Sequence, residues 1–494
     1  MALGLVLFAR GGLLPPMLAG LLLFGVLALI RPDLGLLFVP LAATLFLIPV
    51  PIPGIRASGE FLLPLSEAVL LVVLAASVAN WLWRSMASTI RPATPVIDAA
   101  TAREPAVAGS RSGAAILFAY APHLLFILAG IFGLVIATAD RGAALRDFRR
   151  TILEPLIFYA LLTYYLRLGD TRTAVARGDQ RYATWVAIAF SLSGAFVALL
   201  GLLQAVGLDV VPYLGVKRSF SENVVVLGGI RRVSSVYGHP NNLGLYLGRV
   251  WPIAALLAIR TPPDGARPAV SRRLALLFGL CALLCLGGIL VSFSRGAWLG
   301  AAAALSVLAI PFLRRRFSGW VVPSLAAVIA AIAIAGGLGL MLRGNLGGDS
   351  AATRVAIWRE TLALIGQHPL GIGLDQFYWY HNPEFGRSQI DPALVGTSEQ
   401  FAAHPHNLVL DIWLRMGPLG VITFGWLLAR LFRSGWHSLR RFGSTPNAAF
   451  GLGALAAMTA ALLHGMIDNF YFLPDLAIAF WLLLALVEYT KRAE

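Results

Sequence analysis

Long apolar stretches recur along the whole chain, and they constrain its fold more than any other feature. Many have about 17 to 25 residues, the length that an α-helix needs to cross a hydrocarbon core about 30 Å thick. A soluble fold could not bury so much apolar surface, because 58% of the residues are hydrophobic and only 13% are charged. The sequence therefore predicts an all-α fold, a polytopic transmembrane helical bundle of about 12–14 helices. We expect spans at approximately 13–30, 34–50, 61–83, 114–138, 152–166, 183–206, 243–259, 274–292, 296–313, 319–341, 407–429, 448–467 and 474–489.

The arginines in the short loops predict the orientation of this bundle, because cytoplasmic loops retain an excess of positive charge. Arginine-rich loops alternate with arginine-poor ones from the loop at 84–111 to the C-terminus. The loop at 140–150 also carries arginines, and we place it outside because the opposite choice would invert every other loop. The net charge of +15 therefore reflects topology, and we expect no nucleic-acid partner.

Two loops on the predicted outer side are much longer than the others, at 207–242 and 342–406. Loops of this length in a compact protein are usually functional. Within the second loop, four apolar residues repeat at helical spacing: Val355, Trp358, Leu362 and Ile365. This pattern predicts a short amphipathic helix that lies on the membrane surface or covers a cavity.

Three polar segments lie at the predicted outer surface, and the first runs from Arg231 to Asn242. Arg231 and Arg232 stand where a span begins, and the free N–H groups and dipole of a helix N-terminus favour anions there. An interfacial arginine pair beside a proline turn explains the same spacing equally well.

The second segment is a tight turn between two apolar spans, from Ser292 to Trp298, and it contains Arg295. An arginine at this depth is costly unless it is paired or faces a hydrated cavity, so it is a candidate functional residue. Snorkelling of the guanidinium to the lipid headgroups is the alternative.

The third segment runs from His404 to Asp411 and opens the span after the longer loop. Asn407 is placed to cap the new helix. His406 lies at the mouth of the bundle, where an imidazole can accept a proton from a sugar hydroxyl. The pair formed by His404 and His406 could also ligate a metal, but the sequence shows no third ligand at a recognisable spacing, so we expect no metal. The other histidines of the outer loops are expected to be structural: His239, His368 and His381.

Guanidinium groups and a histidine at an outward cavity suit one kind of reaction. Guanidinium binds phosphate oxygens through paired hydrogen bonds, which fits a lipid diphosphate. A diphosphate with neutralised charge is a good leaving group, so the acceptor needs a base more than the departing oxygen needs an acid. We expect this chemistry to need no cofactor.

These segments resemble those of the O-antigen ligase and Wzy polymerase superfamily of bacterial membrane glycosyltransferases. The similarity lies in Arg232–Asn241, in Ser292–Trp298, in Arg354–Phe377 with its His-Pro-Leu-Gly-Ile-Gly core, and in His406-Asn407 followed by Gly417–Gly420. The resemblance covers about residues 150 to 490. It implies N-terminal transmembrane helices at 1–150 and a catalytic transmembrane region at 151–494. It further implies a GT-C-like fold in the bacterial cytoplasmic membrane, with its active site and long loop facing the periplasm.

The resemblance also implies roles for particular residues. Arg232 and Arg295 would hold the diphosphate of an undecaprenyl-diphosphate-linked glycan donor, and His406 would activate the hydroxyl of a glycan or lipid acceptor. Further candidates are Arg231 and Arg354 for the diphosphate, His404 as the rival base, and Asn241 and Asn407 as supporting residues. Membrane lipids would be the remaining partners.

Three functions fit these observations to different degrees. We favour a ligase that joins the glycan to lipid A core or a similar acceptor, and a Wzy-type polymerase is the close alternative. A transporter or flippase of lipid-linked sugars would be expected to have inverted repeats or paired acids in mid-membrane. No such repeat is apparent, and Glu67 and Asp411 have no symmetric partners.

Overall fold

The protein is a bundle of α-helices, as predicted. The computed structural model describes residues 1–10, 14–47, 64–90, 113–172, 181–214, 225–227, 230–259, 268–314, 350–385, 390–445 and 447–492. Strands in this part of the chain are confined to an antiparallel hairpin, in which β1 (Val225–Leu227) pairs with β2 (Ile230–Arg232).

The helices follow one another in three groups. The first comprises α1 (Ala2–Arg10), α2 (Leu14–Ile30), α3 (Pro32–Leu36), α4 (Val39–Thr44), α5 (Leu65–Ile90) and α6 (Gly113–Ile136). The second comprises α7 (Arg141–Asp147), the π-helix η1 (Phe148–Leu153), α8 (Glu154–Arg172), α9 (Arg181–Ala205), η2 (Val211–Leu214), α11 (Pro240–Ile259), α12 (Pro268–Val291) and α13 (Arg295–Leu313). The third comprises α15 (Ser350–Gln367), α16 (Phe377–His381), η3 (Pro383–Phe385), η4 (Pro392–Leu394), η5 (Ser398–Phe401), α17 (Leu408–Arg440), α18 (Ala448–Gly465) and α19 (Pro474–Arg492).

Seven helices in the described ranges are long and apolar enough to cross a membrane: α5, α9, α11, α12, α13, α17 and α18. The chain is therefore a multi-pass membrane protein, although fewer helices meet both criteria than the about 12–14 that we expected. The predicted span at 319–341 lies outside the described residues. The predicted span at 34–50 begins as two short helices, because Pro40 has no N–H to donate to the carbonyl of Leu36, where α3 ends.

The last helix, α19, forms the centre of the bundle. Between Leu476 and Val487 no residue is more than 4% exposed. The helix packs against α8, α17 and α18, and Trp481 donates a hydrogen bond of 2.8 Å to the hydroxyl of Tyr471. A helix that is apolar on all sides is stable only when it is surrounded by others. Its apolar sequence therefore reflects burial by protein.

A break divides α17 and fixes the segment that follows α15. Gly417 has φ 66° and ψ −168°, a conformation that only glycine adopts readily, and Pro418 follows it. Because proline has no N–H, the carbonyl of Leu414 loses its partner within the helix. It accepts hydrogen bonds instead from the backbone N–H groups of Ile372 (2.7 Å) and Gly373 (3.1 Å). The break thus anchors the loop after α15 to the bundle.

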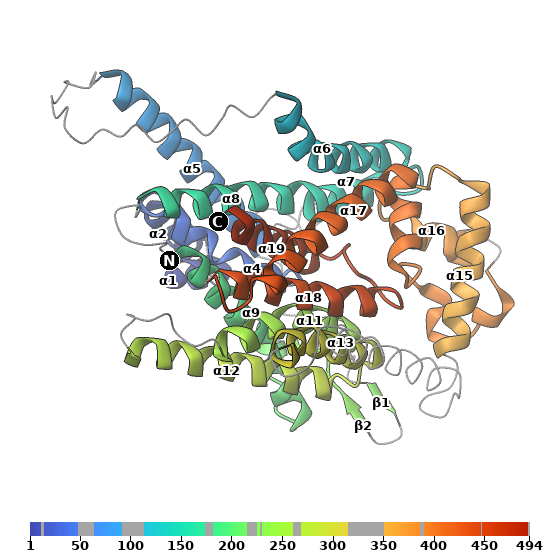
Figure 1. Ribbon diagram of the computed structural model, residues 1–494. Coiled ribbons are helices and arrows are strands. Elements are labelled where there is room, and N and C mark those ends of the chain that lie inside the picture. The colour runs from blue at the N-terminus through green and yellow to red at the C-terminus, as the bar shows by residue number, and fades with distance from the viewer. Residues whose placement is uncertain are drawn as a thin grey trace.

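The long second loop forms a cap, which we define as residues 350–385 and 390–407. Figure 1 shows α15 lying across the end of the bundle, at the end where the β1–β2 hairpin lies and away from both chain termini. The cap has its own small hydrophobic core, which includes Ile357, Phe377 and Leu394. The predicted helix is therefore confirmed.

The buried face of α15 differs from the face that we expected. Trp358 and Ile365 pack against the cap core, but Val355 is 49% exposed and Leu362 is 58% exposed. The helix thus leaves some of its apolar side chains open at the end of the bundle.

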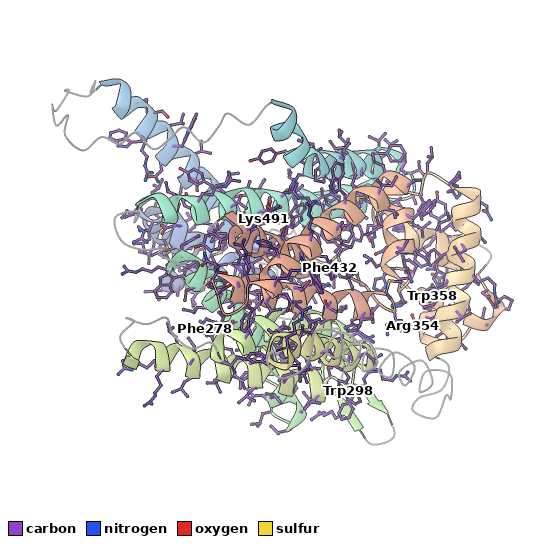
Figure 2. The ribbon with its side chains drawn as sticks, viewed as in Figure 1. Phe278, Trp298, Arg354, Trp358, Phe432 and Lys491 are labelled. Atoms are coloured by element: carbon purple, nitrogen blue, oxygen red, sulfur yellow. The ribbon has the colours of Figure 1, made fainter. Side chains whose placement is uncertain are left out.

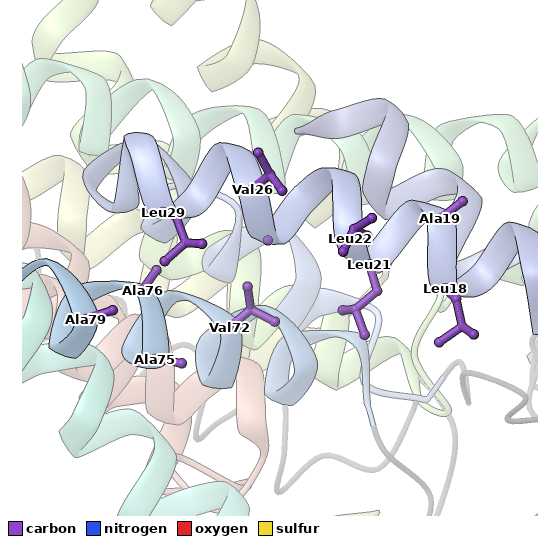
Figure 3. A pocket seen from close by; sticks show the side chains of 11 residues that line it. Leu18, Ala19, Leu21, Leu22, Val26, Leu29, Val72, Ala75, Ala76 and Ala79 are labelled. Carbon is purple, nitrogen blue, oxygen red and sulfur yellow. The ribbon is translucent and has the colours of Figure 1, made fainter.

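A groove of about 670 Å³ lies between α2 and α5. Figure 3 shows aliphatic side chains from both helices around it, including Leu22, Val26 and Val72. Every residue that lines the groove is aliphatic, apart from one glycine. It therefore offers no group that could bind a phosphate or orient a sugar.

Candidate active site

The loop between α18 and α19, residues 466–473, is the structural centre of the candidate site. Its backbone carbonyls accept hydrogen bonds from side chains of the surrounding elements. Asn407 binds the carbonyl of Met466 (3.0 Å), and Arg354 binds that of Ile467 (2.8 Å). These contacts hold the loop in one position, because a buried carbonyl without a donor would be costly.

Asp468 projects from this loop, and its side chain is only 4% exposed. Its carboxylate accepts a hydrogen bond from Asn241 Nδ2 and lies 3.6 Å from Arg354 Nη2. The other oxygen lies 3.3 Å from His406 Nδ1 and accepts from the backbone N–H of Asn469 (2.8 Å). Burial opposes ionisation, but His406 and Arg354 outweigh it and hold the pKa of Asp468 well below its usual range. Asp468 is therefore a carboxylate.

His406 lies between two carboxylates. Its Nδ1 faces Asp468, and its Nε2 lies 3.0 Å from Glu399 Oε2. Burial disfavours the imidazolium, yet the hydrogen bonds with Asp468 and Glu399 raise the pKa of His406 to about 9. Burial likewise raises the pKa of Glu399, and the bond with His406 outweighs it, so that this pKa falls to about 2. Both ring nitrogens of His406 are thus engaged.

Asn407 caps α17 as expected. Its Oδ1 accepts hydrogen bonds from the backbone N–H groups of Val409 (3.0 Å) and Leu410 (3.2 Å). His406 precedes this cap and has a positive φ of 49°. The start of α17 therefore determines where the His406 ring lies.

Three arginines from separate elements lie near the pair formed by His406 and Asp468. Arg232 on β2 donates to the carbonyl of Ser292 (3.2 Å) and to Asn241 Oδ1 (3.3 Å). Burial and the charges of Arg295 and Arg354 lower the pKa of Arg232, so the three guanidinium groups are close enough to repel one another. Figure 2 shows Arg354 on α15 at this end of the bundle.

Arg295 is the first residue of α13. The side chain of Ser294 caps this helix by accepting from the backbone N–H of Ala297. Arg295 therefore lies at the N-terminus of α13, where the free N–H groups and the helix dipole favour an anion.

Arg231 faces away from this cluster. Neighbouring residues of a strand point to opposite sides, so Arg231 and Arg232 diverge. Arg231 Nη1 donates to the carbonyl of Gln204 at the end of α9 (3.4 Å). The structure thus brings together Arg232, Arg295 and Arg354 and leaves Arg231 apart.

His404 lies against His406, with ring centroids 4.3 Å apart and the rings nearly perpendicular. Burial lowers the pKa of His404 to about 4, so its ring is neutral. A ligand atom of His404, one of His406 and one of Asp468 all lie within 4.8 Å of one another. Asp468 thus adds a third ligand-type atom that the spacing of the two histidines could not reveal.

The two other histidines of the longer loop stand apart from this group. His381 is buried in the cap, 2.9 Å from Glu360 Oε1 and 2.8 Å from the carbonyl of Glu399. The ring of His368 packs against Tyr380. Both have the structural surroundings that we expected.

The sequence analysis missed Asp468 and did not single out Glu399. The only available signal for Asp468 was the Asp-Asn pair at 468–469 in a short loop between two apolar stretches. Such a pair is common in polar turns, and only the folded chain brings it to His406.

The comparisons with known proteins bear on this geometry. Residues 280–425 match the Wzy_C family model, described as O-antigen ligase. The match confirms the resemblance to the O-antigen ligase and Wzy superfamily and indicates a glycosyltransferase-type membrane enzyme. The segment contains Arg295, Arg354 and His406, whereas Arg232 and Asp468 lie outside it. No curated protein matches the chain.

Proposed function

We propose that the protein is an O-antigen ligase that transfers a glycan from undecaprenyl diphosphate to an acceptor hydroxyl at the periplasmic face of the bacterial inner membrane. The observation that carries the proposal is the convergence of Arg232, Arg295 and Arg354 on the pair formed by His406 and Asp468. The match to the O-antigen ligase family over 280–425 supports it.

The arginines supply the donor site. Three guanidinium groups and the His406 imidazolium face two carboxylates, Asp468 and Glu399, which leaves an excess of positive charge. A diphosphate would neutralise this excess and relieve the repulsion between the arginines. Neutralised in this way, it is a good leaving group at the anomeric carbon of the glycan.

His406 supplies the base for the acceptor. The acceptor hydroxyl can bind a ring nitrogen of His406 only after the carboxylate that contacts this nitrogen has moved away. The two carboxylates, Asp468 and Glu399, differ in how firmly the structure holds them. Asp468 is fixed within the buried loop, whereas Glu399 belongs to the cap. Glu399 therefore accepts the Nε2 proton of the imidazolium and leaves when the acceptor enters, so that the ring becomes neutral and Nε2 is free. Asp468 keeps the ring oriented, as carboxylates do in hydrolytic triads. The oxygen then attacks in a single displacement with inversion, and Nε2 takes its proton.

Polymerisation of repeat units uses the same donor and the same chemistry, and it is the second candidate. Deletion of the gene separates the two. A ligase predicts free lipid-linked polymer and loss of glycan from the surface acceptor, whereas a polymerase predicts single repeat units on that acceptor. Loss of the surface glycan with lipid-linked sugar held on the cytoplasmic side would indicate a flippase instead.

The neighbouring arginines provide a matched test of the site. Arg232→Ala should lower the transfer rate of the purified protein by about 10- to 100-fold, because it removes charge-assisted hydrogen bonds to the diphosphate. Arg231→Ala should leave the rate within about threefold of wild type, since Arg231 faces Gln204. Equal losses in the two variants would contradict the proposed donor site.

Two further measurements probe the chemistry. His406→Ala should abolish transfer while the protein still inserts into the membrane. A chelator should not lower the wild-type rate, because no step calls for a metal. A requirement for an added divalent cation would contradict this mechanism.

A further inference from the structure

His404, His406 and Asp468 form a cluster of ligand-type atoms beside the donor site. The three ligand atoms all lie within 4.8 Å of one another. His406 Nδ1 and Asp468 Oδ1 are 3.3 Å apart. Tetrahedral zinc with bonds of about 2.0–2.1 Å holds neighbouring ligand atoms about 3.4 Å apart. These two atoms therefore already have the spacing of ligands that share a metal ion.

His404 supplies the second, independent observation. Its Nδ1 is buried and has no hydrogen-bond partner among the described residues. A buried polar atom without a partner costs about 1–3 kcal/mol. The mechanism proposed above uses His406 as the base and gives this neutral imidazole no task.

The surroundings of His406 and Asp468 fit those of metal ligands. Histidine ligands usually donate their second N–H to a carboxylate, which orients the ring and fixes its tautomer. His406 Nε2 has such a partner in Glu399 at 3.0 Å, which leaves Nδ1 to face Asp468 and His404. Asp468 is itself held by Asn241 and by the backbone N–H of Asn469.

The ligand set selects the type of ion. Two imidazoles and one carboxylate suit Zn²⁺ and similar divalent transition metals, with a fourth position left open. Mg²⁺ and Ca²⁺ prefer oxygen ligands and fit this set poorly. Arg354 lies 3.6 Å from Asp468, so an incoming ion must compete with a like charge. We expect weaker binding than at closed structural zinc sites.

We propose that His404, His406 and Asp468 bind a divalent transition-metal ion such as Zn²⁺, and that occupation of this site inhibits the enzyme. The ion takes the place of the proton on His406 Nδ1, which is released on binding. It also puts a dication on Nδ1 in place of the hydrogen bond with Asp468, and this charge makes Nε2 a weaker base for the acceptor hydroxyl. The metal site stands on the ligand cluster, whereas the inhibitory effect rests on the proposed function.

Direct binding tests the site. The full chain, purified with a tag that contains no histidine and freed of metal with a chelator, is dialysed against increasing Zn²⁺, and bound zinc is measured. We expect one ion per chain at the site, with affinity lowered at least about tenfold in His404→Gln. His368→Gln is the matched control, because His368 lies in the same cap and contacts Tyr380, and it should bind as wild type. Wild-type affinity in His404→Gln, or an equal loss in His368→Gln, would overturn the proposal.

A spectroscopic measurement on the wild-type chain covers the case in which His404→Gln does not fold. Co²⁺ in a four-coordinate site with nitrogen and oxygen ligands gives intense visible d–d absorption, whereas six-coordinate Co²⁺ absorbs weakly. We expect the intense bands, which Zn²⁺ should abolish by competition and Mg²⁺ should not. Weak six-coordinate absorption at saturation would overturn the site.

The transfer assay separates this inference from the proposed function. Zn²⁺ should inhibit wild-type transfer, and His404→Gln should need at least about tenfold more zinc for half-inhibition, relative to its own zinc-free rate. A chain that binds zinc through these residues but transfers no glycan would refute the transferase and keep the metal site. Full wild-type transfer at saturating zinc would refute the inhibitory effect alone.

Discussion

Asp468 connects more parts of the candidate site than any other described residue. It contacts Asn241 from α11, Arg354 from α15 and His406 from the start of α17. Asp468→Asn keeps the size of the side chain but removes its charge, so it no longer balances Arg354 or stabilises the imidazolium of His406. We expect transfer to fall by about 10²- to 10⁴-fold, the range for losing a base or its orienting carboxylate. The rate of glycan transfer from purified donor measures this.

Asp391→Asn is the matched control for that substitution. Asp391 lies in the cap, caps η4 and pairs with the exposed Arg359 at 3.2 Å. Asparagine caps helices as well as aspartate does, and an exposed ion pair contributes little. Transfer should stay within about threefold of wild type. A similar loss in both variants would show that negative charge in general, rather than Asp468, supports the reaction.

The sequence predicts some residues of this site and misses others for a physical reason. Arg232, Arg295 and His406 could be selected because each is a polar group at the mouth of an apolar span, which is a local property. Asp468 lies 227 residues from Asn241 and 62 from His406. No periodicity relates residues so far apart, and one sequence does not reveal which spans are neighbours. The sequence likewise could not decide between Arg231 and Arg232, because it did not show that both lie on a strand, where neighbouring side chains point to opposite sides.

The break in α17 is the element that fixes the base of the cap. A Cβ added to Gly417 would lie 2.6 Å from the carbonyl oxygen of Leu370, and the backbone there has φ 66°. Gly417→Ala should therefore lower the free energy of unfolding by at least about 1–3 kcal/mol, because strain and the clash act together. The melting temperature of the protein in detergent measures the change.

Gly425 offers a control on the same helix. A Cβ at Gly425 would meet nothing within 4 Å, and the residue lies inside α17. Gly425→Ala should leave stability unchanged or raise it by up to about 1 kcal/mol, since alanine favours a helix more than glycine does. Lower melting temperatures of equal size in both variants would contradict the special role of the break.

The cap contains a histidine whose charge stabilises it. Both ring nitrogens of His381 face acceptors, the Glu360 carboxylate and the Glu399 carbonyl. Burial acts to lower the pKa of His381, but these hydrogen bonds outweigh it and raise the pKa above 6.5. A group whose pKa is raised by folding contributes its full stability below the unfolded value, and the contribution is lost as the pH rises through the folded value.

The cap should therefore loosen over the pH window that begins near the usual pKa of histidine, about 6.5, and extends upward through the raised pKa of His381. Protection of the amides at 377–401 from hydrogen exchange, corrected for the intrinsic rate at each pH, should fall over this window. His381→Gln should reduce that pH dependence, because glutamine does not titrate and only the pair formed by His406 and Glu399 still responds to pH. A wild-type cap whose protection is constant over the window would refute a charged His381.

Among the elements, the sequence predicts helices with a single apolar character well and predicts their surroundings poorly. The cap helix and the span at α9 have the expected positions, because local periodicity and length determine them. The sequence could not show that α19 is enclosed by protein, since an apolar helix looks the same whether lipid or other helices surround it. It also could not decide whether Pro40 would divide one apolar stretch into α3 and α4, since membrane helices tolerate proline.

At the scale of the whole molecule, one buried ion cluster connects regions that are distant in sequence. Arg415 in α17 lies 2.7 Å from Asp147 at the end of α7 and 2.8 Å from Asp411 one helical turn earlier. Its guanidinium carbon lies 4.4 Å from the ring centroid of Phe472, in the loop that carries Asp468. The cluster thus joins the N-terminal region, the broken helix and the candidate site.

Arg415→Met tests whether this cluster holds the molecule together. It removes the cation and leaves Asp147 and Asp411 buried without it. Such a change lowers the free energy of unfolding by about 3–5 kcal/mol in other buried pairs. The melting temperature of Arg415→Lys should lie between those of the wild type and Arg415→Met, because a single ammonium cannot bind both carboxylates as the planar guanidinium does. Arg433→Met, at an exposed position on the same helix, should leave the melting temperature in detergent nearly unchanged. If Arg415→Met melts like Arg433→Met, these regions are held together by apolar packing alone.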